Sequence, residues 1–256
     1  MINKKIKFRT LMFHDIYENK PDESGFKKPS SNTYKIQQKD FIWLINFLIH
    51  KIEGAGKNVY NLRLTFDDGG KSFLWIAKEL KKKGLVGHFF FSTSYIGTEG
   101  FCSEKDILEI HKLGHIIGNH SHTHPERISA LSSEKIIEEW VKSTNILEAL
   151  IGEKISEASI PNGYCSEASF SILKHLGYKT IFTSTPTIKI KQYKGMKIIG
   201  RFSIRGGGKP IKSYKYLLNS FSPLGIKIYL RWIFLELIKK ITGSKFNHIR
   251  KIITNY

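Results

Sequence analysis

The chain has 256 residues, 41% of them hydrophobic, and its 41 Lys and Arg residues against 22 Asp and Glu give a formal net charge of +19. This length fits one large domain with a packed core, while two cysteines are too few for a disulfide framework and no apolar stretch approaches the roughly 20 residues of a membrane-spanning helix. The charge predicts either an anionic neighbour, such as nucleic acid, a phospholipid surface or an acidic polymer, or only a lysine-rich proteome.

Strands and helices are predicted to alternate along most of the chain. Short apolar runs that end in polar residues predict strands, and apolar residues recurring every three or four positions predict helices. The predicted strands cover residues 6–13, 62–66, 85–91, 115–119, 157–160, 178–183 and 198–204. The predicted helices begin near residues 40, 73, 103, 133 and 170, and residues 17–37 read as a long surface loop. This alternation predicts an α/β fold with a parallel sheet and right-handed crossovers, either open or closed into a barrel.

Polar side chains collect at the carboxyl ends of these strands. His14 follows the first strand, Asp67 and Asp68 follow the second, and His120 and His124 follow the fourth. Chemistry in parallel α/β folds is found at this edge of the sheet. A catalytic zinc-type site takes three nitrogen or oxygen ligands from the protein and leaves one position for water. Asp68, His120 and His124 would make that set, and Asp67 would remain to take a proton from the water.

Two stretches resemble the signature motifs of the NodB-type polysaccharide deacetylases (carbohydrate esterase family 4). They are Thr65-Phe66-Asp67-Asp68-Gly69 and His120-Ser121-His122-Thr123-His124-Pro125. The resemblance covers roughly residues 6–205 and implies a distorted (β/α)7 barrel that hydrolyses an N-acetyl amide on a sugar with the help of a metal. By position, Asp67 matches the catalytic base. Asp68, His120 and His124 match the ligands of a divalent metal, zinc foremost, with cobalt and nickel compatible with the same ligands.

The third motif of that family is matched only in part. Pro161-Asn162-Gly163 lies where this motif is found, and the resemblance implies that the backbone N–H of Asn162 stabilises the oxyanion of the reaction. The arginine that is usual in the motif is absent, and Ser159 and Ile160 lie in its neighbourhood. The sequence therefore identifies no cation that would tune the pKa of Asp67.

The general acid is predicted at the start of the chain. The family usually supplies it as a histidine in a late motif, and no such histidine follows residues 198–204. Residues 11–16, Leu-Met-Phe-His-Asp-Ile, instead resemble the N-terminal segment of a circularly permuted subgroup that includes the poly-N-acetylglucosamine deacetylases. That resemblance implies His14 as the acid, and the alternative is a purely structural histidine.

The character of the chain changes near its end. We expect a deacetylase barrel over residues 1–212 and a basic, apolar helical extension over residues 213–256, with a helix at 226–241. This additional helix either packs against the barrel or lies on an anionic membrane surface. No secretory signal is recognisable at the N-terminus, so we expect a cytoplasmic location, peripheral at the membrane in the second case.

Three functions fit this sequence. The first is metal-dependent release of acetate from an N-acetylated sugar in a polysaccharide or a lipid-linked glycan. The second keeps the fold and the metal but acts on a different acylated substrate, as an esterase or amidase. The third is a non-catalytic module that binds glycan or nucleic acid. The complete set of Asp67, Asp68, His120 and His124 argues against the third, and no nucleic-acid motif accompanies the charge, so nucleic acid is not an expected partner.

Overall fold

The computed structural model describes residues 9–54, 62–206, 230–235, 237, 238 and 241. The chain divides into two compact units, residues 1–211 and residues 212–256. In the second unit every described residue is helical, within the helix predicted at 226–241, and the other residues of that helix lie outside the described part of the chain. No helix among the described residues is both long enough and apolar enough to cross a bilayer.

One nine-stranded sheet forms the framework of the first unit, in the order β11-β1-β4-β5-β6-β7-β8-β10-β9. All neighbouring strands are parallel except β9 and β10. The strands are β1 (Arg9–Phe13), β4 (Leu62–Phe66), β5 (Gly87–Phe91), β6 (Ile116–Asn119), β7 (Glu157–Ser159), β8 (Thr180–Thr183), β9 (Ile190–Tyr193), β10 (Met196–Gly200) and β11 (Phe202–Ser203). Residues 6–8 of the first predicted strand lie outside the described residues.

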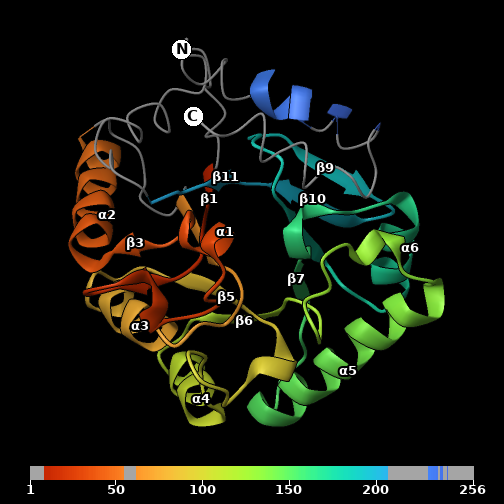
Figure 1. The fold of residues 1–256 in the computed structure, drawn as a ribbon, viewed down its shortest axis with the longest axis horizontal. Coiled ribbons are helices and arrows are strands. Elements are labelled where there is room, and N and C mark those ends of the chain that lie inside the picture. The colour runs from red at the N-terminus through yellow and green to blue at the C-terminus, as the bar shows by residue number, and fades with distance from the viewer. Residues whose placement is uncertain (1–8, 55–61, 207–229, 236, 239–240, 242–256) are drawn as a thin grey trace. The chain divides into compact units, whose positions relative to one another are not determined.

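The two ends of this sheet meet at one interrupted strand. β10 pairs with β8, and β11 pairs with β1, although only Arg201 separates β10 from β11. Counting β10 and β11 as one strand, the parallel strands β1, β4, β5, β6, β7, β8 and β10–β11 close into a ring of seven (Figure 1). The predicted distorted (β/α)7 barrel is thereby confirmed, and of the two sheet forms left open by the sequence the closed one is found.

Helices cover the outside of this ring (Figure 1). They are α2 (Gln38–Glu53), α3 (Phe73–Lys82), α4 (Glu104–Lys112), α5 (Ser133–Ile151) and α6 (Glu167–His175). Each buries one face, as α3 does with Phe73, Ile76 and Leu80. The hydroxyl groups of Ser103 and Ser132 cap the N-termini of α4 and α5. The barrel is distorted between β8 and β10, where the antiparallel strand β9 makes the connection that a helix makes elsewhere.

The segment over residues 17–37 differs from the surface loop that its composition predicts. It contains β2 (Ile16–Tyr17), η1 (Pro21–Glu23), α1 (Pro29–Asn32) and β3 (Ile36–Gln37). Lys35 is only 2% exposed, and its ammonium group donates to the carbonyl oxygens of Pro21, Ser24 and Phe26 at 2.7–2.9 Å. A buried cation must be paired or hydrogen-bonded, and these bonds fold the segment around Lys35.

A buried carboxylate ties the same segment to the barrel. Asp15 is 1% exposed, and its Oδ1 accepts hydrogen bonds from the hydroxyls of Ser24 at 2.6 Å and Ser72 at 3.0 Å. Burial raises the pKa of Asp15 to about 6, although the hydrogen bond from Ser24 acts in the opposite direction. Through Ser24, which is on the segment, and Ser72, which precedes α3, the segment is fixed beside the strand end that carries His14.

Candidate active site

The structure brings the three predicted metal ligands together at the carboxyl ends of β4 and β6. The Nε2 atoms of His120 and His124 each lie 3.3 Å from Oδ1 of Asp68. One ligand atom from each of the three residues lies within 4.8 Å of the others. Ligand atoms placed 2.0–2.2 Å from a tetrahedral zinc ion would lie about 3.3–3.6 Å apart. The donor set and its spacing therefore fit a zinc-type ion.

A neighbouring carbonyl fixes the tautomer of His120. Its Nδ1 lies 2.8 Å from the backbone oxygen of Ser159, and because that oxygen only accepts, Nδ1 carries the proton. This leaves the lone pair of Nε2 directed at the ligand group, which is the arrangement that metal-binding histidines need. Asp68 is 6% exposed. Burial opposes its ionisation, but the imidazoles of His120 and His124 hold the pKa of Asp68 well below its usual range.

Backbone strain is concentrated at this site. Non-glycine residues with positive φ in the described chain are Lys194 and four residues of the site motifs: Asp68 (88°), Ser121 (65°), His124 (55°) and Asn162 (53°). A residue held in this region costs of order 1–3 kcal/mol and persists only where its surroundings impose it. The sequence folds into these turns because hydrogen bonds at the strand ends hold them, and they aim Asp68 and His124 at one another.

The second carboxylate of the pair faces a different partner. Asp67 is 3% exposed and lies in a bidentate ion pair with Arg201, with Nη1–Oδ1 and Nη2–Oδ2 distances of 2.7 Å each. Arg201 is 1% exposed, and its remaining N–H groups donate to Thr65 Oγ1, Ser159 Oγ and the carbonyl oxygen of Thr183. All five donors of the guanidinium group are therefore satisfied. Burial acts to raise the pKa of Asp67, but the charge and hydrogen bonds of Arg201, together with the charges of His120 and His14, outweigh it and lower this pKa below its ordinary value.

Arg201 is the residue of this centre that the sequence did not identify. The motif arginine is absent near residue 159, and the structure supplies a cation instead from the interruption between β10 and β11. Ser159, which lies in the neighbourhood of that motif, donates to Oδ2 of Asp67 at 3.0 Å and accepts from Arg201 at 2.8 Å. One feature of the sequence could have pointed to Arg201. It is a charged residue inside the otherwise apolar run Ile198-Ile199-Gly200-Arg201-Phe202 of the predicted strand 198–204.

His14 lies at the same edge of the barrel, directly after β1. Its ring contacts the ring of Tyr34, with centroids 4.8 Å apart. Burial lowers the pKa of His14, while the charges of Asp68 and Asp67 act in the opposite direction. Its Nδ1 atom is buried and has no hydrogen-bond partner among the described residues. Buried polar atoms in proteins are nearly always hydrogen-bonded, and an unpartnered one marks a candidate catalytic group.

The remaining motif residues lie around this centre. Asn162 is in the 3-10 turn η5 (Pro161–Gly163), which directly follows β7. Phe26, from the segment held by Lys35, places its ring 5.1 Å from the ring of His124. His122 is not among the three residues of the ligand group, and its Nδ1 lies 2.8 Å from Oγ1 of Thr93. The ring of Phe26 forms an apolar wall beside His124, one of the three residues of the ligand group.

Comparisons with known proteins agree with this geometry. The sequence model of the polysaccharide deacetylase family matches residues 55–181. The peptidoglycan-N-acetylmuramic acid deacetylase PdaA of Bacillus subtilis is 28% identical over 190 residues, which are 70% of this chain and 68% of PdaA. The structure of the Streptococcus pyogenes deacetylase PplD in complex with acetate matches with a TM-score of 0.62 at 18% identity, over 85% of this chain and 99% of PplD. The structure of BC0361, a polysaccharide deacetylase from Bacillus cereus, matches with a TM-score of 0.66 at 18% identity, over 82% of this chain and 69% of BC0361. The matched residues 55–181 hold both motifs, and this part of the chain is a polysaccharide deacetylase domain of the NodB type.

Proposed function

We propose that this protein is a metal-dependent carbohydrate N-deacetylase, which hydrolyses the N-acetyl group of a glycan and releases acetate. The observation that carries the proposal is the division of two adjacent carboxylates between two partners. Asp68 faces the imidazoles of His120 and His124, while Asp67 faces Arg201. One carboxylate is thus arranged as a metal ligand and its neighbour as an ionised group beside it. An amide hydrolase that activates water needs both.

Asp67 and Arg201 supply the base. A divalent ion held by Asp68, His120 and His124 would polarise the amide carbonyl and lower the pKa of water toward about 7. Asp67 then takes the proton of the attacking water. Arg201 keeps this carboxylate ionised and fixed in orientation, since it lowers the pKa of Asp67 and binds both of its oxygens. The lowered pKa makes Asp67 a weak base, which suffices only for water that has itself been made acidic.

His14 and Asn162 act on the other two groups that develop charge during the reaction, the departing amine and the oxyanion. The imidazole of His14 donates a proton to the departing amine, which would otherwise leave as a poor anionic leaving group. The backbone N–H of Asn162 donates to the oxyanion that forms when water adds to the carbonyl carbon. The position of His14 directly after β1 and that of Asn162 directly after β7, both at the barrel edge that carries Asp67 and Asp68, support these roles. Zinc is the expected ion, and cobalt or nickel would suit the same donors.

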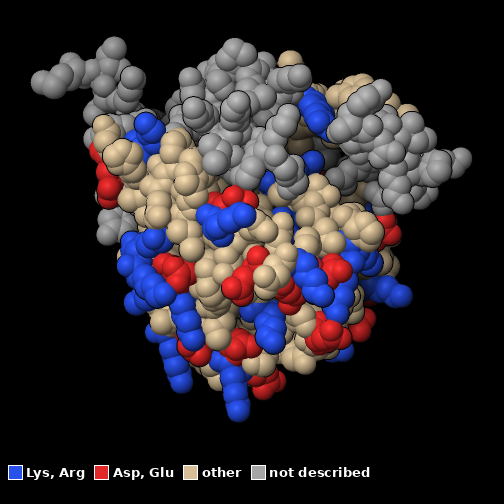
Figure 2. All heavy atoms as spheres, turned by 60° about the vertical axis from the view of Figure 1, so that its left-hand side comes forward, with Lys and Arg blue, Asp and Glu red and all other residues tan. Residues whose placement is uncertain are grey.

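An N-acetylated glycan is the expected substrate. The name of the relative PdaA describes an enzyme acting on N-acetylmuramic acid of peptidoglycan, and the PplD structure was obtained with acetate. Nucleic acid is not an expected partner, and Figure 2 shows one face on which Lys and Arg side chains are interspersed with Asp and Glu. A continuous basic surface, which nucleic-acid binding requires, is not seen on that face.

The test of this function is acetate release by the full-length protein from N-acetylglucosamine oligomers, peptidoglycan fragments and lipid-linked N-acetyl sugars, with O-acetyl esters as the contrasting substrates. We expect acetate from at least one N-acetyl glycan, loss of release after treatment with a chelator, and recovery when zinc is added back. Release from esters alone would show that the protein is an esterase. Zinc binding without release from any of these substrates would show that the substrate class is wrong.

Replacement of His14 with alanine is expected to lower kcat by about 10²–10⁴-fold, the usual contribution of a positioned acid or base. The bound zinc should remain stoichiometric, because His14 is not one of the three ligands. The matched control is His175→Ala, which removes an exposed histidine at the end of α6 and should leave kcat unchanged. Full activity of His14→Ala would show that this histidine is structural.

The prediction that an anionic membrane is a partner concerns residues 213–256. Within this extension the structure describes exposed apolar side chains at Leu230, Phe234, Leu237 and Ile241. An apolar helix with basic neighbours in the sequence suits the surface of an anionic bilayer. Flotation with vesicles of anionic lipid, comparing the full chain with one ending at residue 212, checks this prediction, and equal flotation of the two would contradict it.

A further inference from the structure

The loop that carries both histidine ligands has all of its backbone N–H groups bonded. Side-chain acceptors take four of these five donors, and a strand carbonyl takes the other. The bonds run from His120 N to Phe91 O (3.0 Å), Ser121 N to Asn119 Oδ1 (2.8 Å), His122 N to Glu139 Oε2 (2.9 Å), Thr123 N to Glu139 Oε2 (2.8 Å) and His124 N to Ser121 Oγ (3.2 Å). Residues 120–124 are therefore held by defined partners rather than by regular secondary structure.

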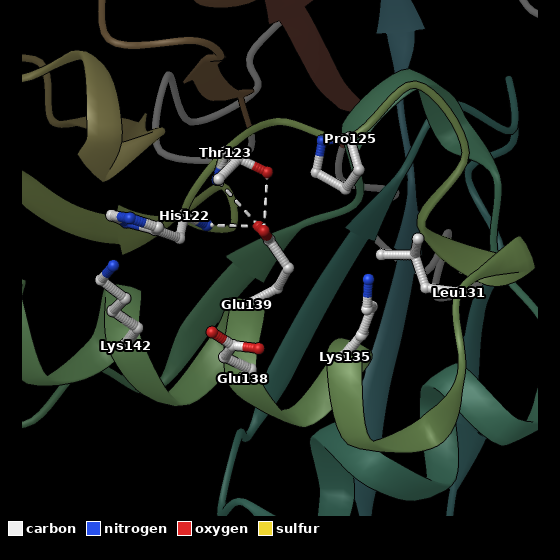
Figure 3. Close-up of a pocket in the computed structure, with 8 residues that line it drawn as sticks. All are labelled: His122, Thr123, Pro125, Leu131, Lys135, Glu138, Glu139 and Lys142. Atoms are coloured by element: carbon white, nitrogen blue, oxygen red, sulfur yellow. Dashed lines mark hydrogen bonds between the residues drawn. The ribbon is translucent and has the colours of Figure 1, made fainter.

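Glu139 has the largest share in this arrangement. Besides the N–H groups of His122 and Thr123, its carboxylate accepts the hydroxyl of Thr123, with an Oγ1–Oε1 distance of 2.6 Å. Figure 3 shows the carboxylate directed from α5 toward the loop, with Lys135 and Lys142 on either side of it. These residues line a cavity of about 350 Å³ on the outer side of the loop. Hydrogen bonds to a carboxylate are stronger than hydrogen bonds to a neutral acceptor, so the three bonds to Glu139 are a strong attachment for the loop.

The loop needs such an anchor because it is strained. Ser121 and His124 both have positive φ, at 65° and 55°. The helix that carries Glu139 is a rigid support, since the next residue, Trp140, is fully buried and its carbonyl oxygen accepts from Asn119 Nδ2 at 3.3 Å. The carboxylate therefore connects a fixed point on α5 to the strained turn between the two ligands.

We propose that Glu139 is a positioning residue for the metal site, which holds the turn between His120 and His124 in the conformation that aims both Nε2 atoms at Asp68. Its hydrogen bonds go to the backbone N–H groups of His122 and Thr123 and to the hydroxyl of Thr123, so it acts through the loop rather than as a ligand. The inference rests on the proposed metal site. Groups that orient metal ligands typically contribute 10–100-fold in metal affinity.

The test compares zinc affinity in full-length variants, measured by competition with a chromogenic chelator after the protein has been stripped of metal. Glu139→Ala is expected to bind zinc about 10–100-fold more weakly than wild type. Glu139→Gln keeps an acceptor for the two backbone N–H groups and should lie within a few-fold of wild type. The matched control is Glu138→Ala, which removes an exposed carboxylate from the adjacent position of α5 and should bind as wild type does.

Thermal unfolding of the metal-free variants separates positioning from general stability. We expect Glu139→Ala and Glu138→Ala to unfold at similar temperatures without metal and to differ only in their zinc affinity. Equal zinc affinity of these two variants would overturn the inference while leaving the proposed function intact, and failure of wild type to bind zinc would overturn both. Should Glu139→Ala not fold, Thr123→Val removes one of the three bonds, and unchanged zinc affinity in that variant would overturn the inference equally.

Discussion

Replacement of Arg201 with methionine is expected to lower the free energy of unfolding by about 3–5 kcal/mol, the usual cost of removing one partner of a buried ion pair. Methionine has a similar length and suits the apolar surroundings, so the loss comes from the carboxylate of Asp67. That group would remain 3% exposed without its bidentate partner. Urea unfolding of the two proteins measures the difference. The matched control is Lys197→Met, which removes an exposed cation from β10 and is expected to change stability by less than about 0.5 kcal/mol.

A double variant sharpens this prediction. The loss of stability in Arg201→Met is attributed to the unpaired buried charge of Asp67. If this is correct, the double variant Arg201→Met with Asp67→Asn should be more stable than the sum of the two single losses implies, because it contains neither buried charge. The two groups are in contact, so an interaction energy of 0.5–3 kcal/mol or more is expected from the cycle, roughly the range measured for coupled neighbours. Strict additivity of the two changes would show that the pair contributes little.

Replacement of Asp67 with asparagine is expected to lower kcat/KM by about 10²–10⁴-fold, because an amide cannot accept the proton of the attacking water. The zinc content should stay at the wild-type value, since Asp68, His120 and His124 are unchanged. Acetate release at several zinc concentrations, measured below the unfolding temperature of the variant, checks both parts. Asp22→Asn changes an exposed carboxylate in the same way and serves as the control.

Two other results would contradict the assignment of Asp67 as the base. Retention of full activity by Asp67→Asn would show that water is activated without this carboxylate. Loss of zinc in parallel with activity would show that Asp67 supports the metal rather than the proton transfer.

The grouping of Asp68, His120 and His124 could be predicted because the two motifs that supply these residues are each local in the sequence. Asp67 and Asp68 are adjacent, His120 and His124 are four residues apart, and each pair follows an apolar run that reads clearly as a strand. Parallel strands bring their carboxyl ends to one edge, so the two motifs meet without further information. The periodicity of apolar residues also predicted the alternation of strands and helices. It left two forms of the sheet open, and the closed barrel was one of them.

The partner of Asp67 could not be predicted in this way. Arg201 is 134 residues away in the sequence, and its role depends on which strand neighbours close the ring. Two other features have similar causes. β9 is almost wholly exposed, so it has no apolar pattern to mark it. The segment over residues 17–37 has a polar composition, and only the tertiary structure shows that Lys35 and Asp15 lie inside.

The interruption of the last strand at Arg201 has a consequence for the order in which the enzyme matures. β4 and its Asp67 come long before β10 in the chain, so Asp67 gains its counterion only when the final strand is in place. Docking of the final strand neutralises this charge and joins β8 to β1 in the same step. Closure of the ring is therefore also the step that pairs Asp67, the proposed base, with its cation, and a chain that carries both motifs without the final strand lacks that pair.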